Sequence, residues 1–260
     1  MNGTPVRWTI SVVSHGHGER VAAGLADIHG QLEGVEHRFV LTLNAREDPG
    51  FVDRLPPAIR ARLHLIRNAR PRGFAANHNA ALRGCRSRYV LVADPDLRLS
   101  DTVFPDLERA LGNPACGIVA PLAQTSLGDD EDNGRDLPTL PALLRRRLFG
   151  RDRDIPRDPP PQREVVWLAG LFLALRAETF QRLGGFDERY HMYCEDVDLC
   201  LRARALGLTV DQLCSLRIVH DARRGSLRSP RHFLWHSQSL LRLWRSPAYR
   251  AARGTRGALR

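Results

Sequence analysis

Two aspartates follow an apolar run of the sequence and are separated by one proline. The run Tyr89–Ala93 has the length and composition of a buried strand, and Asp94 and Asp96 come directly after it. In an extended segment, residues two apart point to the same side, and Pro95 favours an extended backbone at Asp94. Two carboxylates that face one point repel each other unless a cation lies between them. The spacing therefore predicts a site for Mg²⁺ or Mn²⁺, with substrate phosphates completing the ion's shell, or alternatively an ordinary Asp-Pro-Asp turn.

A second acidic pair, Glu195 and Asp196, opens a stretch with helical spacing. The apolar residues of that stretch recur on one side, and Gly207 is a typical helix end. Four bulky apolar residues precede the pair: Phe186, Tyr190, Met192 and Tyr193. Apolar surroundings raise the pKa of a carboxyl group, which is how a general base is tuned. The pair is thus a candidate for proton transfer, and the alternative is acidic residues that complement the dipole of a helix N-terminus.

Strand-like and helix-like segments alternate in the first hundred residues. The strand-like segments are Trp8–Val13, Arg38–Asn44, Arg62–Asn68 and Tyr89–Ala93. Helical patterns occur at 21–32, 73–85 and 177–183, and an apolar, strand-like run begins at Val165. This alternation predicts an α/β fold in which helices flank a parallel sheet. Ligands of such sheets bind beyond the carboxyl ends of the strands, which is where Asp94 and Asp96 are expected.

Residues 124–163 lack any such pattern. The stretch begins with an acidic, polar run and continues with many prolines and arginines. An excursion of this length inside a compact domain is commonly either functional or disordered. We expect a mobile lid over the site, with a disordered surface insertion as the alternative.

Residues 227–260 form a basic C-terminal extension. Ser229 and Pro230 are helix start signals and Pro247 is a stop signal, which predicts a helix over 229–250. On one side of this helix lie Phe233, Leu234, Leu240, Leu241 and Trp244, and on other sides Arg231, Arg242 and Arg245. A basic amphipathic helix of this kind suits either the interface of an anionic membrane or packing on the domain. The last ten residues, 251–260, are expected to be disordered.

The composition limits the class of protein. The chain has 260 residues, a hydrophobic content of 43% and a net charge of +10, and arginine supplies all 39 basic residues. A basic balance fits nucleic acid, a membrane surface or a phosphorylated substrate as partner, or merely a biased codon supply. An odd number of cysteines without a C-x-x-C pair argues against a zinc site or a disulfide framework and for a reducing compartment. Because the N-terminus does not resemble a signal peptide and no long apolar run occurs, we expect a soluble, cytoplasmic protein.

These motifs, in this order, resemble those of the inverting glycosyltransferases of family 2, and most of all the bacterial rhamnosyltransferase-like members. The segments that carry the resemblance are ISVVSHGHG at 10–18, NARPRGFAANHNAAL at 68–82, ADPDLRL at 93–99, WLAGLFLALRAETFQRLGGFDERYHMYCEDVDLCLRA at 167–203 and VHDARRGS at 219–226. The resemblance implies a GT-A domain over residues 1–226. Its sheet would be Rossmann-like and mostly parallel, flanked by helices, and the C-terminal helical extension would follow it.

The resemblance also implies roles for individual residues. Asp196 would be the catalytic base and Glu195 would orient the acceptor, while Asp94, Asp96 and His220 would hold a Mg²⁺ or Mn²⁺ ion. The residues implied for the nucleotide-sugar donor are Ser14, His15, Gly16, Asn44, Arg67, Gly73, Asn77, Asn79 and Asp94. The residues implied for the acceptor are Trp167, Gly170 and Tyr193, although Trp167 could instead only pack in the core.

The implied activity is transfer of a sugar, with inversion, from a nucleoside-diphosphate sugar to a hydroxyl of a bacterial cell-surface polysaccharide or lipid-linked glycan. A carboxylate that takes the acceptor proton and a cation at the diphosphate suffice for one displacement. Rhamnose is the expected sugar. Leu43 stands where many relatives carry a base-contacting aspartate, so both UDP and dTDP stay open as carriers. The protein would lie in the cytoplasm, and its C-terminal helix could touch the inner face of the plasma membrane.

Other classes of protein remain as alternatives. A catalytically inactive GT-A-like binding protein would keep the fold without transferring a sugar. A basic nucleic-acid-binding protein would explain the charge, but the sequence has no recognised motif of that class, and we expect no nucleic acid as partner. Gly16-His17-Gly18 begins a dinucleotide-binding fingerprint, but position 21 is Val21, which argues against an oxidoreductase.

Overall fold

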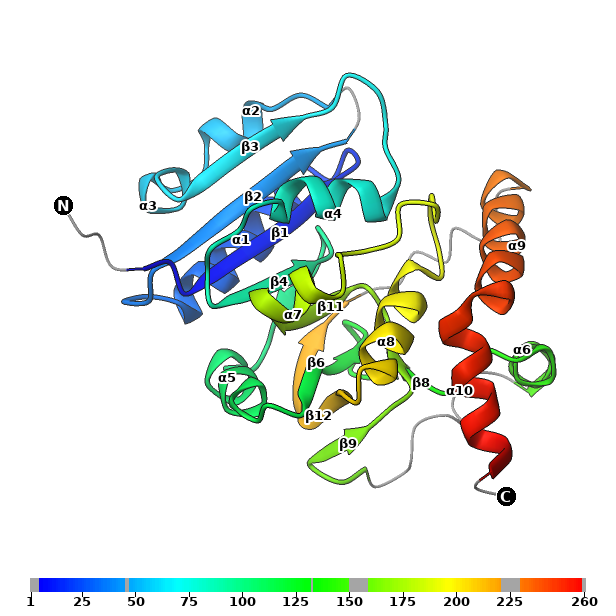
Figure 1. Ribbon diagram of the computed structural model, residues 1–260. Coiled ribbons are helices and arrows are strands. Elements are labelled where there is room, and N and C mark those ends of the chain that lie inside the picture. Colours follow the sequence, from blue (N-terminus) through cyan, green and yellow to red (C-terminus); the bar gives the residue numbers. More distant parts are fainter. Residues whose placement is uncertain (1–4, 45–46, 132, 150–158, 221–229, 259–260) are drawn as a thin grey trace.

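The computed structural model describes residues 5–44, 47–131, 133–149, 159–220 and 230–258 (Figure 1). Residues 221–226, the end of the last motif of the resemblance, therefore lie outside the described part of the chain. Among the helices that the structure describes, none combines the length and the apolar character that a membrane span requires.

A ten-stranded sheet organises the described chain. Its main path runs β3-β2-β1-β4-β11-β6-β12-β5, while β7 pairs with β6 and β9 with β12. Its strands are β1 (Trp8–Ser14), β2 (His37–Leu43), β3 (Leu63–Arg67), β4 (Tyr89–Ala93), β5 (Arg98–Leu99), β6 (Cys116–Gln124), β7 (Asp130–Glu131), β9 (Gln162–Glu164), β11 (Phe172–Arg176) and β12 (Thr209–Val219). The first four are mutually parallel, as predicted, whereas β11 runs antiparallel to both β4 and β6. A small second sheet pairs β8 (Gly134–Arg135) with β10 (Trp167–Leu168).

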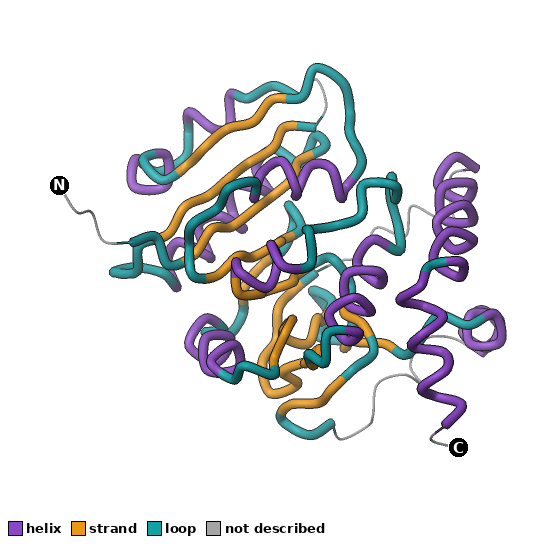
Figure 2. The backbone as a smooth tube through the Cα atoms, in the orientation of Figure 1, coloured by secondary structure: helices purple, strands orange, loops and turns teal. Residues whose placement is uncertain are grey.

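Helices cover the sheet and extend from one side of it. They are α1 (Glu19–Gln31), α2 (Gly50–Asp53), α3 (Pro57–Arg60), α4 (Phe74–Leu82), α5 (Phe104–Gly112), α6 (Leu140–Phe149), α7 (Ala177–Arg182), α8 (Glu195–Ala205), α9 (Pro230–Arg245) and α10 (Pro247–Ala258). Helix α4 packs on β1 and β2, α5 packs on β6, and α8 packs against β10 and β12. Helix α10 packs on α8, and α6, α9 and α10 lie together on the side of the molecule remote from β3 (Figures 1 and 2).

The central strands are buried on both faces, which explains their nearly continuous apolar sequence. Every residue of β1 and β4 is buried. At the start of β1 the ring of Trp8 packs on Tyr89 and Phe104, with ring centroids 4.8 and 5.1 Å away. All five cysteines are free, as their number and spacing predicted.

The four strands predicted in the first hundred residues are present, with ends within one residue of the prediction. Asn44 follows β2 and is not part of it, and α4 covers only the middle of the helix predicted at 73–85. Gly73 and Arg83, the residues that flank α4, both have an extended backbone. The helix therefore begins and ends where the backbone leaves the helical region.

The expectation that residues 124–163 lack regular structure is wrong for the described part of that segment. It contains β7, β8 and α6, and it ends in β9. Strands β7 and β9 pair with β6 and β12, so their stability comes from partners that are distant in the sequence and that no local pattern signals. Residues 132 and 150–158 lie outside the described residues, and movement of the segment as a lid stays a prediction.

The expectation of disorder over 251–260 is wrong for residues 251–258, because α10 continues to Ala258, and residues 259–260 lie outside the described part of the chain. Tyr249 anchors this helix: its ring is buried, and its hydroxyl donates to the carbonyl of Pro138 at 3.3 Å. Alanine and arginine, which recur through 250–258, are good helix formers. The predicted stop at Pro247 is where α9 gives way to α10.

Candidate active site

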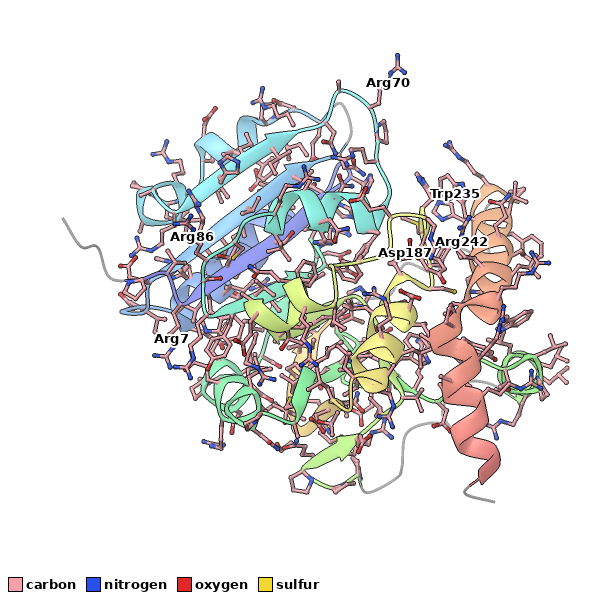
Figure 3. The ribbon with its side chains drawn as sticks, in the orientation of Figure 1. Arg7, Arg70, Arg86, Asp187, Trp235 and Arg242 are labelled. Carbon is pink, nitrogen blue, oxygen red and sulfur yellow. The ribbon has the colours of Figure 1, made fainter. Side chains whose placement is uncertain are left out.

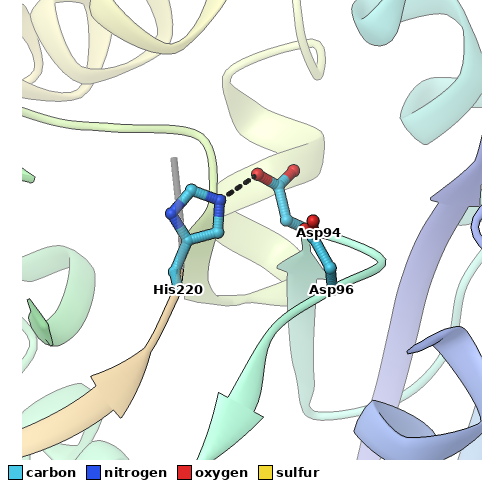
Figure 4. A group of neighbouring side chains, drawn as sticks. All are labelled: Asp94, Asp96 and His220. Carbon is cyan, nitrogen blue, oxygen red and sulfur yellow. Dashed lines mark ion pairs between the residues drawn. The ribbon is translucent and has the colours of Figure 1, made fainter. Parts of the chain in front are cut away.

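Three side chains that suit a divalent cation converge at the carboxyl ends of β4 and β12 (Figure 4). Asp94 and Asp96 follow β4, and His220 follows β12. One ligand atom from each lies within 4.8 Å of the other two. Two carboxylate oxygens and one imidazole nitrogen form a donor set that suits Mn²⁺, and the carboxylates also suit Mg²⁺. The structure thus brings together the metal-binding group that the resemblance implied.

His220 lies between two carboxylates. Its Nε2 is 3.3 Å from Oδ2 of Asp94, and its Nδ1 is 3.1 Å from Oε2 of Glu131. Burial alone would lower the pKa of His220, but the hydrogen bonds and charges of Asp94 and Glu131 outweigh it and raise this pKa to about 10. A proton on His220 thus places positive charge among the carboxylates, and a divalent cation bound there would replace that proton, because only a deprotonated imidazole nitrogen can be a ligand. Glu131 comes from β7, in the segment predicted to lack structure, so the sequence did not single it out.

The second acidic pair lies at the N-terminus of α8, after a turn with an unusual backbone. Tyr193 and Cys194 have φ of 72° and 65°, in the left-handed region that residues with a Cβ rarely adopt. Two such residues in succession, directly before Glu195 and Asp196, indicate local strain that the surrounding packing must hold. Strain of this kind is concentrated at functional sites, where it fixes the direction of reactive groups.

Asp196 is held by two backbone donors. The N–H of Gly170 donates to its Oδ2 at 2.9 Å, and the N–H of Val197 donates to its Oδ1 at 2.8 Å. The side chain remains partly exposed. Burial raises the pKa of Asp196, while these two hydrogen bonds and the charge of Arg135 oppose the rise. Gly170, which the resemblance implied for the acceptor, therefore orients the carboxylate of Asp196.

Glu195 has the opposite environment. Its side chain is only 5% exposed, and its Oε2 has no hydrogen-bond partner among the described residues. Burial raises the pKa of Glu195 well above the usual range, and the charge of Asp196 raises it further. Glu195 therefore retains a proton more readily than Asp196, whose carboxylate accepts two backbone hydrogen bonds.

Two of the asparagines implied for the nucleotide are buried and bind protein groups. Asn44 accepts hydrogen bonds from Asn68 at 2.7 Å and from the backbone N–H of Arg72 at 2.8 Å, and it donates to the carbonyl of Arg72 at 2.8 Å. Asn77 accepts from Asn68 at 2.7 Å and donates to the carbonyl of Arg72 at 3.2 Å. Asn44 and Asn77 thus position the loop at 68–73, and the sequence did not identify Asn68 or Arg72 as their partners.

The loop after β1 is wrapped around a carboxylate. The hydroxyl of Ser14 and the backbone N–H groups of Gly16 and Gly18 donate to Glu47 at 2.9, 3.0 and 3.0 Å. The φ angles of Gly16 and Gly18, 81° and 49°, lie in the region that glycine adopts most readily. His15 lies at the same place, with its Nε2 2.9 Å from the Nδ2 of Asn44. Glu47 was not among the residues identified from the sequence, although it lies shortly after Leu43, where the resemblance implied a base-contacting aspartate.

Three other residues implied for the donor have different surroundings. A Cβ on Gly73 would lie 2.4 Å from the carbonyl oxygen of His191, so only glycine fits there. Arg67 is exposed at the end of β3. Asn79 accepts from the N–H of Phe186 at 2.9 Å and donates to its carbonyl at 2.8 Å. These contacts hold the loop before Tyr190, and contact of Asn79 with the nucleotide stays a prediction.

The two remaining acceptor candidates, Trp167 and Tyr193, both precede the acidic pair in the sequence. Trp167 is buried, donates its indole N–H to the carbonyl of Asp136 at 2.7 Å and lies under the guanidinium of Arg135. It therefore packs in the interior, and its contact with an acceptor stays a prediction. Tyr193 is half-buried, and its hydroxyl lies 2.8 Å from Nδ1 of His232 on α9.

Solved structures share this arrangement of elements. One is described as the crystal structure of GalNAc-T7 with UDP, GalNAc and Mn²⁺; it has a TM-score of 0.64 and 14% identity, over 84% of this chain and 44% of that one. Another is the mannosyltransferase PcManGT from Pyrobaculum calidifontis in complex with GDP-Man and Mn²⁺; it has a TM-score of 0.61 and 18% identity, over 98% of this chain and 76% of that one. Both are GT-A glycosyltransferases, and the fold of this chain is the GT-A fold.

Sequence comparison gives the family. The family model described as Glycosyl transferase family 2 matches residues 51–165. Rhamnosyltransferase WbbL of Escherichia coli K12 is 35% identical over 183 residues, which are 65% of this chain and 69% of the relative. The N-acetylglucosaminyl-diphospho-decaprenol L-rhamnosyltransferase of Mycobacterium tuberculosis H37Rv is 30% identical over 188 residues, which are 64% of this chain and 61% of the relative. The chain belongs to glycosyl transferase family 2, as its motifs predicted.

Proposed function

We propose that this protein is an inverting glycosyltransferase that uses a nucleoside-diphosphate sugar and a divalent cation. One observation carries the proposal: the consecutive residues Gly170 and Leu171 connect the proposed base, Asp196, to Asp94 of the proposed cation site. The N–H of Gly170 donates to Asp196, and the carbonyl of Leu171 accepts from the N–H of Asp94 at 2.9 Å. A base for the acceptor and a cation for the leaving group, supported by one segment, are the two elements that this reaction needs.

The arrangement supports a single displacement. Asp196, ionised and held by two backbone donors, takes the proton of the acceptor hydroxyl as its oxygen attacks the anomeric carbon. The bond from that carbon to the diphosphate breaks on the opposite side, which inverts the configuration. A divalent cation held by Asp94, Asp96 and His220 would stabilise the charge of the departing diphosphate. Glu195, neutral in this proposal, leaves Asp196 as the only charge of the pair, and its part in orienting the acceptor stays a prediction.

The donor would lie over the loops that follow β1 and β3. Ser14, His15 and Gly16 belong to the first loop, and the asparagine network holds the second in place. Asp94 would contact both the cation and the sugar nucleotide. We propose L-rhamnose as the transferred sugar, because the two relatives above are named rhamnosyltransferases. Its carrier would be dTDP or UDP.

The acceptor would be a lipid-linked glycan or another precursor of a cell-surface polysaccharide. The name of the mycobacterial relative includes a decaprenol diphosphate carrier, and a further match, over 75 residues, is to an O-antigen biosynthesis protein of Myxococcus xanthus. Such an acceptor is embedded in a bilayer. The enzyme would therefore act from the cytoplasm at the inner face of the plasma membrane.

A thermal-shift panel tests the donor site. UDP, dTDP and GDP are each added with and without Mn²⁺ to the wild type, to Asp96→Asn and to the control Asp106→Asn on α5. We expect UDP or dTDP to stabilise the wild type and the control only with Mn²⁺, by about 2.7 kcal/mol at a hundred times the dissociation constant, and Asp96→Asn to lose this shift. The absence of a metal-dependent shift with every nucleotide would contradict the proposal.

A further inference from the structure

Helix α9 has one face on the domain and one exposed apolar face. Ser239 and Leu243 are buried, and the hydroxyl of Ser239 donates to the carbonyl of Met192 at 2.9 Å. Phe233, Leu234 and Leu241, which at 3.6 residues per turn point away from this buried face, are exposed. Packing on the domain and contact with a membrane, the two alternatives that the sequence left open for this helix, are thus compatible. The helix packs on the domain and still presents bulky apolar side chains outward.

Helix α6 adds a second apolar stripe on the same side of the molecule (Figure 1). Leu140, Leu144 and Leu148 are four residues apart and therefore lie on one face, and all three are exposed. The segment leading into α6 is tied to the C-terminal helices, because the indole N–H of Trp244 donates to the carbonyl of Pro138 at 2.9 Å. Together with the three residues of α9, these leucines form a set whose exposed fractions run from 49% to 73%. We call these six residues the α6–α9 face.

Helices α6 and α9, which carry this face, and helix α10, which contacts α9, are strongly basic. Each of α6, α9 and α10 has three arginines, and none has an aspartate or glutamate, although the chain as a whole has 29 acidic residues. Arg242 and Arg245 are exposed on α9. Exposed apolar side chains flanked by arginines are the pattern of helices that lie in the interface of an anionic bilayer. A second copy of the chain is a poorer occupant, because two-fold pairing would bring these like-charged helices together.

The face is also connected to the catalytic turn. Figure 3 shows Trp235 and Arg242 between α9 and the loop that carries Asp187. The ring of Trp235 lies 4.6 Å from that of His191, and the hydroxyl of Tyr193 lies 2.8 Å from Nδ1 of His232. Tyr193 is two residues before Glu195. An element bound at the α6–α9 face would therefore lie beside the helix that braces the proposed base.

We infer that the α6–α9 face docks on an anionic phospholipid bilayer and presents the active site to a lipid-linked acceptor. The binding surface rests on the geometry above, whereas its purpose rests on the proposed function. Binding is expected to fall with salt, because part of it is the attraction between arginines and anionic headgroups.

Flotation with vesicles tests the inference without any sugar substrate. The protein is mixed with vesicles of phosphatidylcholine alone, or with vesicles that also contain about 30% phosphatidylglycerol, at low and at high salt. The variants are Leu234→Ser/Leu241→Ser and Leu144→Ser for the apolar stripes, and Arg242→Gln/Arg245→Gln for the charge. The matched control is Leu127→Ser, since Leu127 is 88% exposed but lies outside the α6–α9 face.

We expect binding only to the anionic vesicles. The double leucine variant should lose about tenfold or more in partitioning, and the double arginine variant about twentyfold, since each arginine near an anionic surface is worth roughly fivefold. Leu127→Ser should bind like the wild type. Failure of the wild type to float, equal flotation of all variants, or a wild-type dimer that Leu241→Ser dissociates would overturn the inference. Metal-dependent nucleotide binding, measured on the same samples, shows separately whether the donor site is intact.

Discussion

The different roles proposed for Asp196 and Glu195 predict different outcomes for two conservative substitutions. Asp196→Asn removes the proposed base, whereas Glu195→Gln replaces a neutral carboxylic acid with a neutral amide of nearly the same shape. A positioned general base contributes between about 10² and 10⁴ in rate. We therefore expect Asp196→Asn to lower kcat by about 10³, and Glu195→Gln to change it by less than about tenfold.

The two substitutions should also differ in their effect on stability. Both oxygens of Asp196 accept backbone N–H groups, so an asparagine must turn its amide N–H₂ toward one of these donors. The loss of that hydrogen bond should cost about 1–3 kcal/mol. The pKa of Glu195 is raised in the folded state, so wild-type stability falls as pH rises from the usual glutamate range to the folded-state pKa. Glu195→Gln removes this fall and should be at least as stable as the wild type at neutral pH.

The pH dependence of transfer identifies the base directly. Because the pKa of Asp196 is raised, kcat/KM should fall with decreasing pH, with a midpoint above the ordinary range of an aspartate. This acid limb should keep its position in Glu195→Gln. The assay follows nucleotide release in the presence of donor and acceptor from about pH 4.5 to about pH 9, with folding checked by circular dichroism. Loss of the limb in Glu195→Gln, or a fully active Asp196→Asn, would refute the assignment.

Three further predictions concern the supports of the site. Gly73→Ala should destabilise the fold by about 1–3 kcal/mol, because its Cβ would lie 2.4 Å from the carbonyl oxygen of His191. The control Gly30→Ala, in open space on α1, should be neutral or stabilising. Equal urea midpoints for the two variants would show that the contact at Gly73 is tolerated. Glu47→Gln should weaken nucleotide binding in calorimetry by about tenfold, because an amide cannot accept from all the donors of the loop after β1, and unchanged affinity would speak against that role. Asn79→Ala should lower the stability of the fold by about 1–3 kcal/mol, because it removes two hydrogen bonds to Phe186, and it should leave the affinity for the nucleotide unchanged. A loss of affinity without a loss of stability would instead support the nucleotide contact that the resemblance implied.

Much of the chemistry of this chain could be predicted from the sequence, because it depends on neighbours in the chain. The apolar run of β4 followed by Asp94 and Asp96 places two carboxylates at a strand end, and the residues around Glu195 and Asp196 place a second pair at a helix start. The alternation of strand-like and helix-like segments sufficed to predict the parallel half of the sheet, and the resemblance to family 2 sufficed to predict the GT-A fold. The strand ends and the helix start follow from local backbone periodicity, which a single sequence displays, whereas the GT-A fold was implied by the resemblance.

The tertiary structure alone decided which groups meet. His220 reaches Asp94 only because β12 lies in the same sheet as β4, and Glu131 reaches His220 only because β7 pairs with β6. The sequence implied a pair of carboxylates at 195 and 196, but only the fold shows that Gly170 donates to Asp196 and that burial raises the pKa of Glu195 well above its usual range.

The same holds for the outer surface. The pattern of α9 left both membrane contact and packing open, and only the docked helix shows which side chains are buried against Met192 and which remain exposed beside α6. Hydrogen bonds, desolvation and exposure depend on distances between segments that are far apart in the chain. A sequence therefore names the groups that can do chemistry, and the packing of the fold sets their charge, direction and partners.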